Sequence, residues 1–157
     1  MEPKLIEIQP FTVSGISVRT LNSDEAQPSK AKLPGLWGQF FGQGLADKVP
    51  NKLAESPVYG VYSAYESDAS GQYSVTAGVS VSKASPAFDS IEVSGGPYLV
   101  FETKGPMPQI VIENWARVWS FFETSKEFKR SFTIDFEVYR GPDEVAIHIA
   151  VEVDVGT

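Results

Sequence analysis

The nonapeptide SFTIDFEVY, residues 131–139, alternates apolar and polar side chains along its length. A period of two is typical of a β-strand with one packed face. The turn Gly141-Pro142-Asp143 and a second alternating segment, 144–153, follow it, so we expect an antiparallel hairpin. We expect the apolar parity to face helices and the other parity to face solvent or a pocket. The apolar parity is Phe132, Ile134, Phe136 and Val138, and the other is Thr133, Asp135, Glu137 and Tyr139.

Two helices and several further strands are expected upstream of this hairpin. Apolar residues three or four positions apart predict one helix from Leu33 to about Leu45 and another from about Pro108 to Glu123. Alternating segments predict strands at 4–9, 11–20, 57–65, 72–81 and 98–103, with a short strand at 91–93 and a turn at 67–71. This order of elements predicts an α+β fold with antiparallel hairpins.

Each half of the chain repeats the same order of elements. Trp37 and Trp115 are 78 positions apart, and each lies on the apolar face of its predicted helix. The segments YGVY (59–62) and FEVY (136–139) are 77 positions apart, and each lies in the first strand after its helix. Each half reads strand, helix, strand, strand. We therefore predict one domain over residues 1–157, built from pseudo-repeats at about 1–82 and 83–157.

The composition indicates a folded domain and excludes several classes of function. The chain has 157 residues, no cysteine, 20 acidic and 13 basic side chains, and a net charge of −7. Disulfides and cysteine chemistry are excluded, and the charge disfavours direct binding to nucleic acid. We expect the one basic cluster, KEFKR at 126–130, to be a solvated helix end. An acidic protein attracts cationic ligands, although acidity mostly serves solubility.

The sequence also predicts a soluble, cytoplasmic protein with no membrane segment. Its apolar runs are only a few residues long, whereas a membrane-spanning helix needs about 20 residues. The start, Met1-Glu2-Pro3-Lys4, lacks the charged and then apolar pattern of a secretory signal peptide.

Glu137 is the first candidate site residue. It lies in the middle of the strand and two residues before Tyr139, on the parity expected to face a pocket. Its echo in the first half of the chain is Gly60, so one carboxylate breaks the internal symmetry. The ordinary alternative is a solvent-facing strand glutamate. If Glu137 is buried, desolvation should raise its pKa, and a ligand cation about 4 Å away would gain roughly 4 kcal/mol before desolvation costs.

Aromatic side chains are the second feature. Tyr62, Tyr98 and Tyr139 fall on predicted strands, while Trp37 and Trp115 fall on helix faces. Aromatic walls with a carboxylate suit a flat, cationic, lipophilic ligand, because rings add stacking and cation–π attraction of about 0.5–2 kcal/mol each. The alternative for each ring is an ordinary place in the core.

The sequence contains no recognisable metal, cofactor or catalytic motif. His148 is the only histidine, which is too few ligands for a metal site in a chain without cysteine. A G-x-S-x-G elbow, a P-loop and a G-x-G-x-x-G fingerprint are all absent. We therefore expect no metal, no cofactor and no assigned catalytic residue.

The chain resembles the GyrI-like, AraC-type effector-binding domain family from about residue 4 to residue 153. The resemblance is carried by GLWGQFF, PVYGVY, GGPYLVFETKG and IENWARVW, and above all by DFEVY at 135–139. It implies two strand–helix–strand–strand modules with antiparallel sheets around a central ligand cavity and two main helices. Members sense drugs for transcription activators and bind lipophilic cations through a buried glutamate and aromatic walls.

The resemblance carries the family glutamate over to Glu137. It makes Tyr139 a neighbour of the ligand and gives plausible wall positions to Tyr62, Tyr98, Trp37 and Trp115. No helix-turn-helix segment is recognisable. We therefore expect a stand-alone effector-binding protein that does not bind nucleic acid directly.

Three functions follow from this interpretation. The first is non-enzymatic binding of amphipathic, cationic aromatic molecules, with Glu137 as counter-charge. The second is hydrolysis of reactive cyclopropane-type natural products by the same glutamate, with Asp135 or Glu102 as a second carboxylate. The third is a protein-interaction role, such as the gyrase inhibition known among relatives, with an unidentified protein partner.

Overall fold

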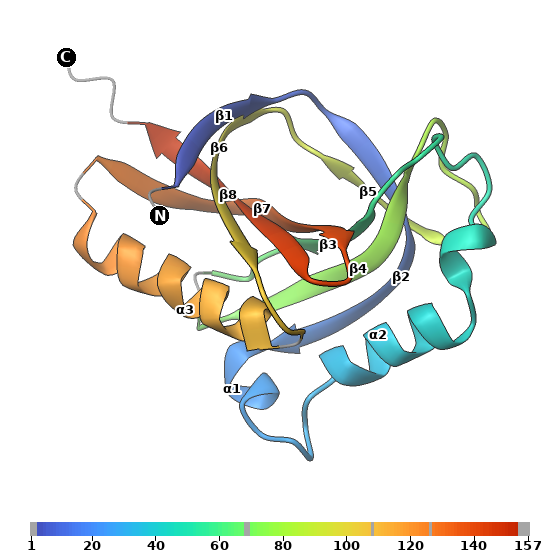
Figure 1. The fold of residues 1–157 in the computed structure, drawn as a ribbon, viewed down its shortest axis with the longest axis horizontal. Coiled ribbons are helices and arrows are strands. Elements are labelled where there is room, and N and C mark those ends of the chain that lie inside the picture. The colour runs from blue at the N-terminus through green and yellow to red at the C-terminus, as the bar shows by residue number, and fades with distance from the viewer. Residues whose placement is uncertain (1–2, 68–69, 108, 126, 154–157) are drawn as a thin grey trace.

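The computed structural model describes residues 3–67, 70–107, 109–125 and 127–153 and has the predicted α+β fold (Figure 1). The strands of this described part are β1 (Lys4–Ile8), β2 (Phe11–Leu21), β3 (Val58–Ser63), β4 (Gln72–Val81), β5 (Asp89–Val93), β6 (Gly96–Lys104), β7 (Phe128–Gly141) and β8 (Glu144–Val153). The helices are α1 (Asn22–Glu25), α2 (Leu33–Gly42), the 3-10 turn η1 (Leu45–Asp47) and α3 (Gln109–Thr124). Asp68 and Ala69 of the expected turn, and Pro108 at the expected helix start, lie outside the described residues.

The eight strands form one antiparallel sheet in the order β1-β6-β8-β7-β3-β4-β2-β5. Outward from the central β3–β7 pair, β4 and β2 follow on one side, and β8 and β6 follow on the other. The two strand–helix–strand–strand units therefore have the same strand order about the centre, and their strands join in a single sheet. The outermost strands are exchanged between the units, because β1 pairs with β6 and β5 pairs with β2.

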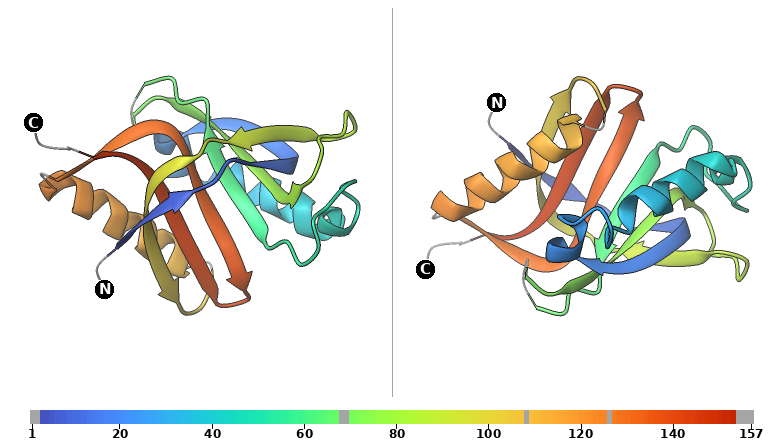
Figure 2. Two further views of the ribbon diagram at one scale, coloured as in Figure 1. Left: turned by 90° about the horizontal axis from the view of Figure 1, so that it is seen from above. Right: turned by 90° about the horizontal axis from the view of Figure 1, so that it is seen from below.

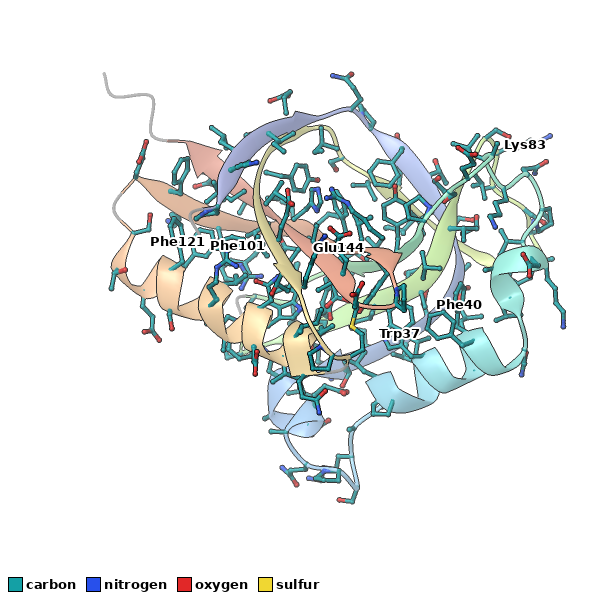
Figure 3. All side chains as sticks on the ribbon, viewed as in Figure 1. Trp37, Phe40, Lys83, Phe101, Phe121 and Glu144 are labelled. Carbon is teal, nitrogen blue, oxygen red and sulfur yellow. The ribbon has the colours of Figure 1, made fainter. Side chains whose placement is uncertain are left out.

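Helices α2 and α3 cover the same face of this sheet (Figure 2). Leu36 and Phe40 of α2 are four residues apart and pack against β4, and Phe40 lies between α2 and the sheet in Figure 3. The buried residues of α3 have the same spacing, and its Asn114 donates through Nδ2 to the Phe101 carbonyl at 2.8 Å. Glu25 of α1 accepts the backbone N–H groups of Lys32 and Leu33, which satisfies donors that a helix start leaves free.

The two faces of β7 are used in the opposite way to our prediction. Ile134, Phe136 and Val138 do not face the helices, because they pack with side chains from other strands. The partners are Val13, Val61, Val93, Tyr98 and Ala150, with Ile8, Phe11, Tyr59 and Ile91 at the margin. The sheet curves around this cluster (Figure 1). Its helix-free face therefore encloses a second core, which contains the apolar side chains of β7. Glu137 and Tyr139 face the helices, where they meet Trp115 of α3 and Trp37 of α2.

Phe132 is the exception within its parity. The register of β7 against β8 shifts between Arg130 and Asp135, and Phe132 has φ +51° there. A β-bulge of this kind re-aims the side chains around it. The ring of Phe132 lies beside Arg130 and Tyr65 and not with Phe136.

Among the described residues, no helix combines the length and apolar character needed to cross a membrane.

Candidate functional site

Glu137 lies at the centre of the helix-covered face and is 1% exposed. Its carboxylate accepts three hydrogen bonds from three different elements. Tyr62 of β3 donates through its hydroxyl to Oε2 at 3.1 Å, and Trp115 of α3 donates through Nε1 to the same oxygen at 2.6 Å. Tyr139 of β7 donates to Oε1 at 2.8 Å. The structure thus brings four of the predicted site residues into one hydrogen-bonded group.

Gly60 makes room for this group. It pairs with Glu137 across β3 and β7. The two positions at which the halves of the sequence differ in this way are therefore direct neighbours. A Cβ on residue 60 would lie 2.8 Å from Glu137 Oε1 and 2.9 Å from Trp37 Cζ2. Trp37 also meets the ring of Tyr139 edge-on at 5.2 Å. Trp37 therefore joins the margin of the group only because residue 60 has no side chain.

The Glu137 carboxylate is a buried acid with no basic partner in the described part of the chain. Burial raises its pKa, and the hydrogen bonds from Trp115, Tyr139 and Tyr62 oppose that rise because they favour the ionised form. Burial also holds the pKa values of the Tyr62 and Tyr139 hydroxyls well above their usual range, so both remain donors. A buried charge balanced only by hydrogen-bond donors is a place where a ligand cation would be stabilised.

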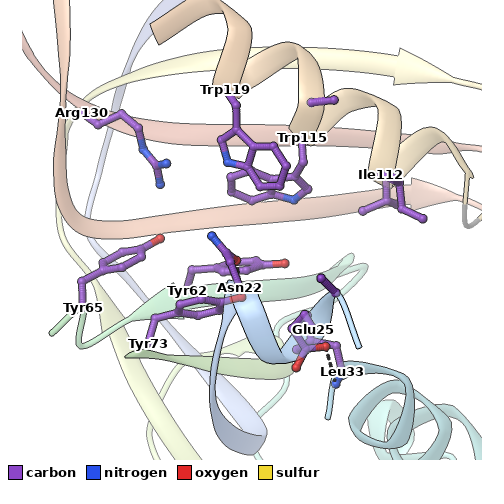
Figure 4. A pocket seen from close by; sticks show the side chains of 13 residues that line it. Asn22, Glu25, Leu33, Tyr62, Tyr65, Tyr73, Ile112, Trp115, Trp119 and Arg130 are labelled. Carbon is purple, nitrogen blue, oxygen red and sulfur yellow. Dashed lines mark hydrogen bonds between the residues drawn. The ribbon is translucent and has the colours of Figure 1, made fainter. Parts of the chain in front are cut away.

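A pocket of about 420 Å³ adjoins this group (Figure 4). It lies between α3, α1, the start of α2 and the strands, and its walls are mainly aromatic and apolar. The lining residues are Asn22, Glu25, Ala26, Leu33, Tyr62, Tyr65, Tyr73, Val111, Ile112, Trp115, Ala116, Trp119 and Arg130. Ile112 and Trp119 are 68% and 45% exposed, so they form part of its outer rim.

Tyr62 and Trp115 belong both to the pocket wall and to the hydrogen-bonded group around Glu137. Glu137 itself does not line the pocket, and neither do Tyr139 and Trp37. The carboxylate therefore lies behind the Tyr62 and Trp115 rings. A molecule in the pocket meets these two aromatic side chains before it meets the charge.

Tyr98 is the predicted wall residue that the structure does not bring to this site. Its side chain lies in the second core on the helix-free face, where its ring is 5.3 Å from that of Phe136. Its hydroxyl donates to the Ser94 carbonyl at 2.7 Å. The sequence showed that Tyr98 alternates with its neighbours, but alternation does not say which face of the sheet each parity takes.

A buried ion pair that the sequence did not predict lies at one end of the pocket. Arg130 Nη2 lies 2.7 Å from Asp135 Oδ2, and the two side chains are 8% and 0% exposed. Tyr65 donates its hydroxyl to the same Asp135 oxygen at 2.5 Å, and the Ala150 backbone N–H donates to the other at 2.9 Å. The prediction that Arg130 belongs to a solvated helix end is wrong, because β7 begins at Phe128 and carries Arg130 inward.

The other two candidate acids have partners of their own, and the histidine lies on the other face of the sheet. The oxygens of Asp135 are already engaged as described, and Glu102 lies 3.8 Å from Arg140 with 40% of its side chain exposed. His148 stacks on Phe136 in the second core at 4.3 Å, where burial lowers its pKa to about 4. In the described residues, no group of His, Asp and Glu side chains could hold a metal ion.

Comparisons with known proteins point to one family. Residues 4–153 match the family described as Cass2, integron-associated effector binding protein. An integron cassette protein, VCH_CASS2, from the mobile metagenome of Vibrio cholerae has 38% sequence identity and a TM-score of 0.83, covering 97% of each chain.

Two further solved structures share the fold at lower identity. SAV2435, whose structure was solved with tetraphenylphosphonium, has 21% identity and a TM-score of 0.80, covering 97% of this chain and 94% of its own. A putative transcription regulation protein from Staphylococcus aureus MU50 has 21% identity and a TM-score of 0.75, covering 97% of this chain and 99% of its own. A comparison with curated proteins gave no significant match.

Proposed function

Because the chain belongs to the Cass2 family of integron-associated effector-binding proteins, we propose that it binds amphipathic, cationic aromatic small molecules without transforming them. The observation that carries the proposal is the carboxylate of Glu137, which is 1% exposed and accepts only neutral donors. The cation bound by SAV2435, a protein of the same fold, supports the choice of ligand class.

The pocket supports a ligand of drug size. Its volume of about 420 Å³ falls in the range of roughly 300–1,000 Å³ that is common for small-molecule sites. Five of its lining residues are tyrosines or tryptophans, namely Tyr62, Tyr65, Tyr73, Trp115 and Trp119. Aromatic faces attract both apolar rings and positive charge, so this wall suits an aromatic cation.

A bound cation acts on Glu137 in one of two ways that the geometry allows. From within the pocket, its field reaches the carboxylate across the rings of Tyr62 and Trp115, which both donate to it. For direct contact, the Trp115 indole or the Tyr62 phenol must rotate away and give up its hydrogen bond. In both cases the cation favours the ionised form of Glu137, and the carboxylate supplies the charge selectivity.

The positions of the other acids favour binding over hydrolysis. A general acid or base working with Glu137 would need a second free carboxylate or an activated water near it. Both oxygens of Asp135 already accept hydrogen bonds, and Glu102 faces Arg140. We therefore assign Glu137 a counter-charge role.

Matched probes of opposite charge test the proposal. Tetraphenylphosphonium and tetraphenylborate have nearly the same shape, so their difference in affinity reports on charge. We expect tetraphenylphosphonium to quench the fluorescence of Trp115 and Trp119 and to bind at least about tenfold more tightly than tetraphenylborate, because one tenfold step needs only about 1.4 kcal/mol. Equal affinity for the two ions would contradict a cation site.

A further inference from the structure

Arg130 is a cation in the wall of a pocket that we propose takes cations. Its side chain is 8% exposed, and Figure 4 shows it reaching toward the space beside Tyr65 and Trp119. A guanidinium has five N–H donors. Nη2 donates to Asp135, whereas Nε has no hydrogen-bond partner among the residues that the structure describes. A buried donor without an acceptor is costly and calls for a partner.

The guanidinium is held in place and cannot turn outward at low cost. Its Cζ lies 4.3 Å from the centre of the Phe132 ring, and the bulge in β7 keeps that ring beside it. Asp135 in turn is fixed by the Tyr65 hydroxyl and the Ala150 backbone N–H. The guanidinium of Arg130 is therefore held in one orientation in the pocket wall, which lowers the entropic cost of binding an acceptor there.

Trp115 lies between the negative and the positive group. Its indole N–H donates to Glu137 at 2.6 Å, and its ring centre is 6.0 Å from Arg130 Cζ. An aromatic ligand that packs on Trp115 therefore has Glu137 behind the indole ring and Arg130 beside it in the pocket wall. A positive group of the ligand would be stabilised by Glu137, and a hydrogen-bond acceptor would lie near Arg130.

From this arrangement we infer that Arg130 forms a polar subsite for a hydrogen-bond acceptor on the ligand. This inference rests on the proposed cation-binding function and narrows its ligand class. The preferred ligand is an aromatic cation that also carries a carbonyl, ester, sulfonyl or carboxylate group. Its positive centre lies toward Glu137, and its acceptor lies toward Arg130. The Arg130–Asp135 pair then selects among cations and does not repel them, because Asp135 balances its charge.

The test compares triphenylphosphonium ions of equal charge. One series carries plain alkyl chains, and the other carries a terminal methyl ester on chains of the same length. Calorimetry on the wild-type protein should show tighter binding of the ester for at least one chain length, by about fivefold or more, as expected for an acceptor that meets a charged donor. Arg130→Lys keeps the charge beside Asp135 but removes Nε–H and the planar fork. In this variant the ester should lose its advantage over the alkyl ligand of the same chain length, and this ratio within one protein is the readout because Arg130 itself lines the pocket.

The outcomes separate this inference from the proposed function. If the alkyl and ester ions bind equally to the wild type at every chain length, water satisfies Arg130 and the inference is wrong, while cation binding stands. A preference that survives in Arg130→Lys also overturns the assignment to Arg130. If neither series binds, the proposed function fails and the inference fails with it. Thermal melts of Arg130→Lys check its folding, and the wild-type comparison decides the question without that variant.

Discussion

Gly60 and Glu137 are paired across β3 and β7, and a Cβ on residue 60 would lie only 2.8 Å from Glu137 Oε1. The two positions occupy equivalent places in the two halves of the chain. One half supplies the carboxylate, and the other supplies the space that the carboxylate and Trp37 occupy. One asymmetric site therefore lies at the centre of a sheet whose strand order is the same on both sides of the β3–β7 pair.

Gly60→Ala should destabilise the protein and weaken ligand binding. The added methyl group would meet the Glu137 carboxylate and the Trp37 ring, which are both packed, so we expect a loss of about 1–3 kcal/mol in the free energy of unfolding. Urea unfolding measures it. Gly38→Ala is the matched control, because a Cβ there meets nothing within 4 Å and the residue lies in α2. That variant should be stabilised by up to about 1 kcal/mol. An equal effect of the two substitutions would contradict the packing described here.

Affinity for tetraphenylphosphonium should fall as the pH is lowered through the pKa of Glu137. Burial raises this pKa, so protonation begins at a higher pH than for an exposed glutamate. The bound cation favours the ionised form, which means that binding releases a proton wherever free Glu137 is protonated. Calorimetric titrations across the acidic range measure the change in affinity. A pH dependence that persists unchanged in Glu137→Gln would assign it to another group.

The stability of the fold should depend on His148 at mildly acidic pH. Burial lowers the pKa of His148 from 6.5 to about 4 in the folded chain. The unfolded chain therefore takes up a proton first, so the His148 contribution to folding stability should be constant above pH about 6.5 and should fall as the pH drops toward 4, by at most about 3 kcal/mol.

Urea unfolding of the wild type and of His148→Leu over this pH range isolates the histidine contribution, because every carboxylate is common to both proteins. The difference between their unfolding free energies should change with pH. A constant difference would show that His148 titrates normally in the folded chain.

Removal of Asp135 should be more damaging than removal of the pair. Asp135→Ala leaves the Arg130 guanidinium buried without its counter-charge, which typically costs about 3–5 kcal/mol. The double substitution Asp135→Ala with Arg130→Met should recover part of that loss, because it removes both charges. Unfolding free energies of the wild type, of Asp135→Ala, of Arg130→Met and of the double variant form a thermodynamic cycle. Strict additivity would mean that the two side chains do not interact.

Alternation and the internal echo were enough to predict the α+β fold and to single out Glu137, with Tyr139 beside it. They could not predict which face of β7 meets the helices, because a period of two separates the parities without placing them. The apolar side chains of β7 lie on the helix-free face because the curved sheet encloses a second core there. Tyr98 of β6 lies in this second core for the same reason.

Nothing in the sequence indicated that Arg130 and Asp135 would form an ion pair at the pocket. Arg130 and Asp135 are five residues apart, which places them on opposite faces of a regular strand. They meet because of the bulge between them, where Phe132 has a positive φ. A phenylalanine gives no local indication of such a conformation, unlike glycine or asparagine. Only the three-dimensional packing of β7 against β8 reveals this pair.

Calorimetry of tetraphenylphosphonium with two charge-matched variants tests most directly whether the carboxylate of Glu137 holds the bound cation. Glu137→Gln removes the buried carboxylate, whereas Glu113→Gln removes an exposed one from α3, outside the pocket lining. We predict that Glu137→Gln weakens binding at least about tenfold and that Glu113→Gln changes it by less than about twofold. Unchanged affinity in a folded Glu137→Gln variant would contradict the account.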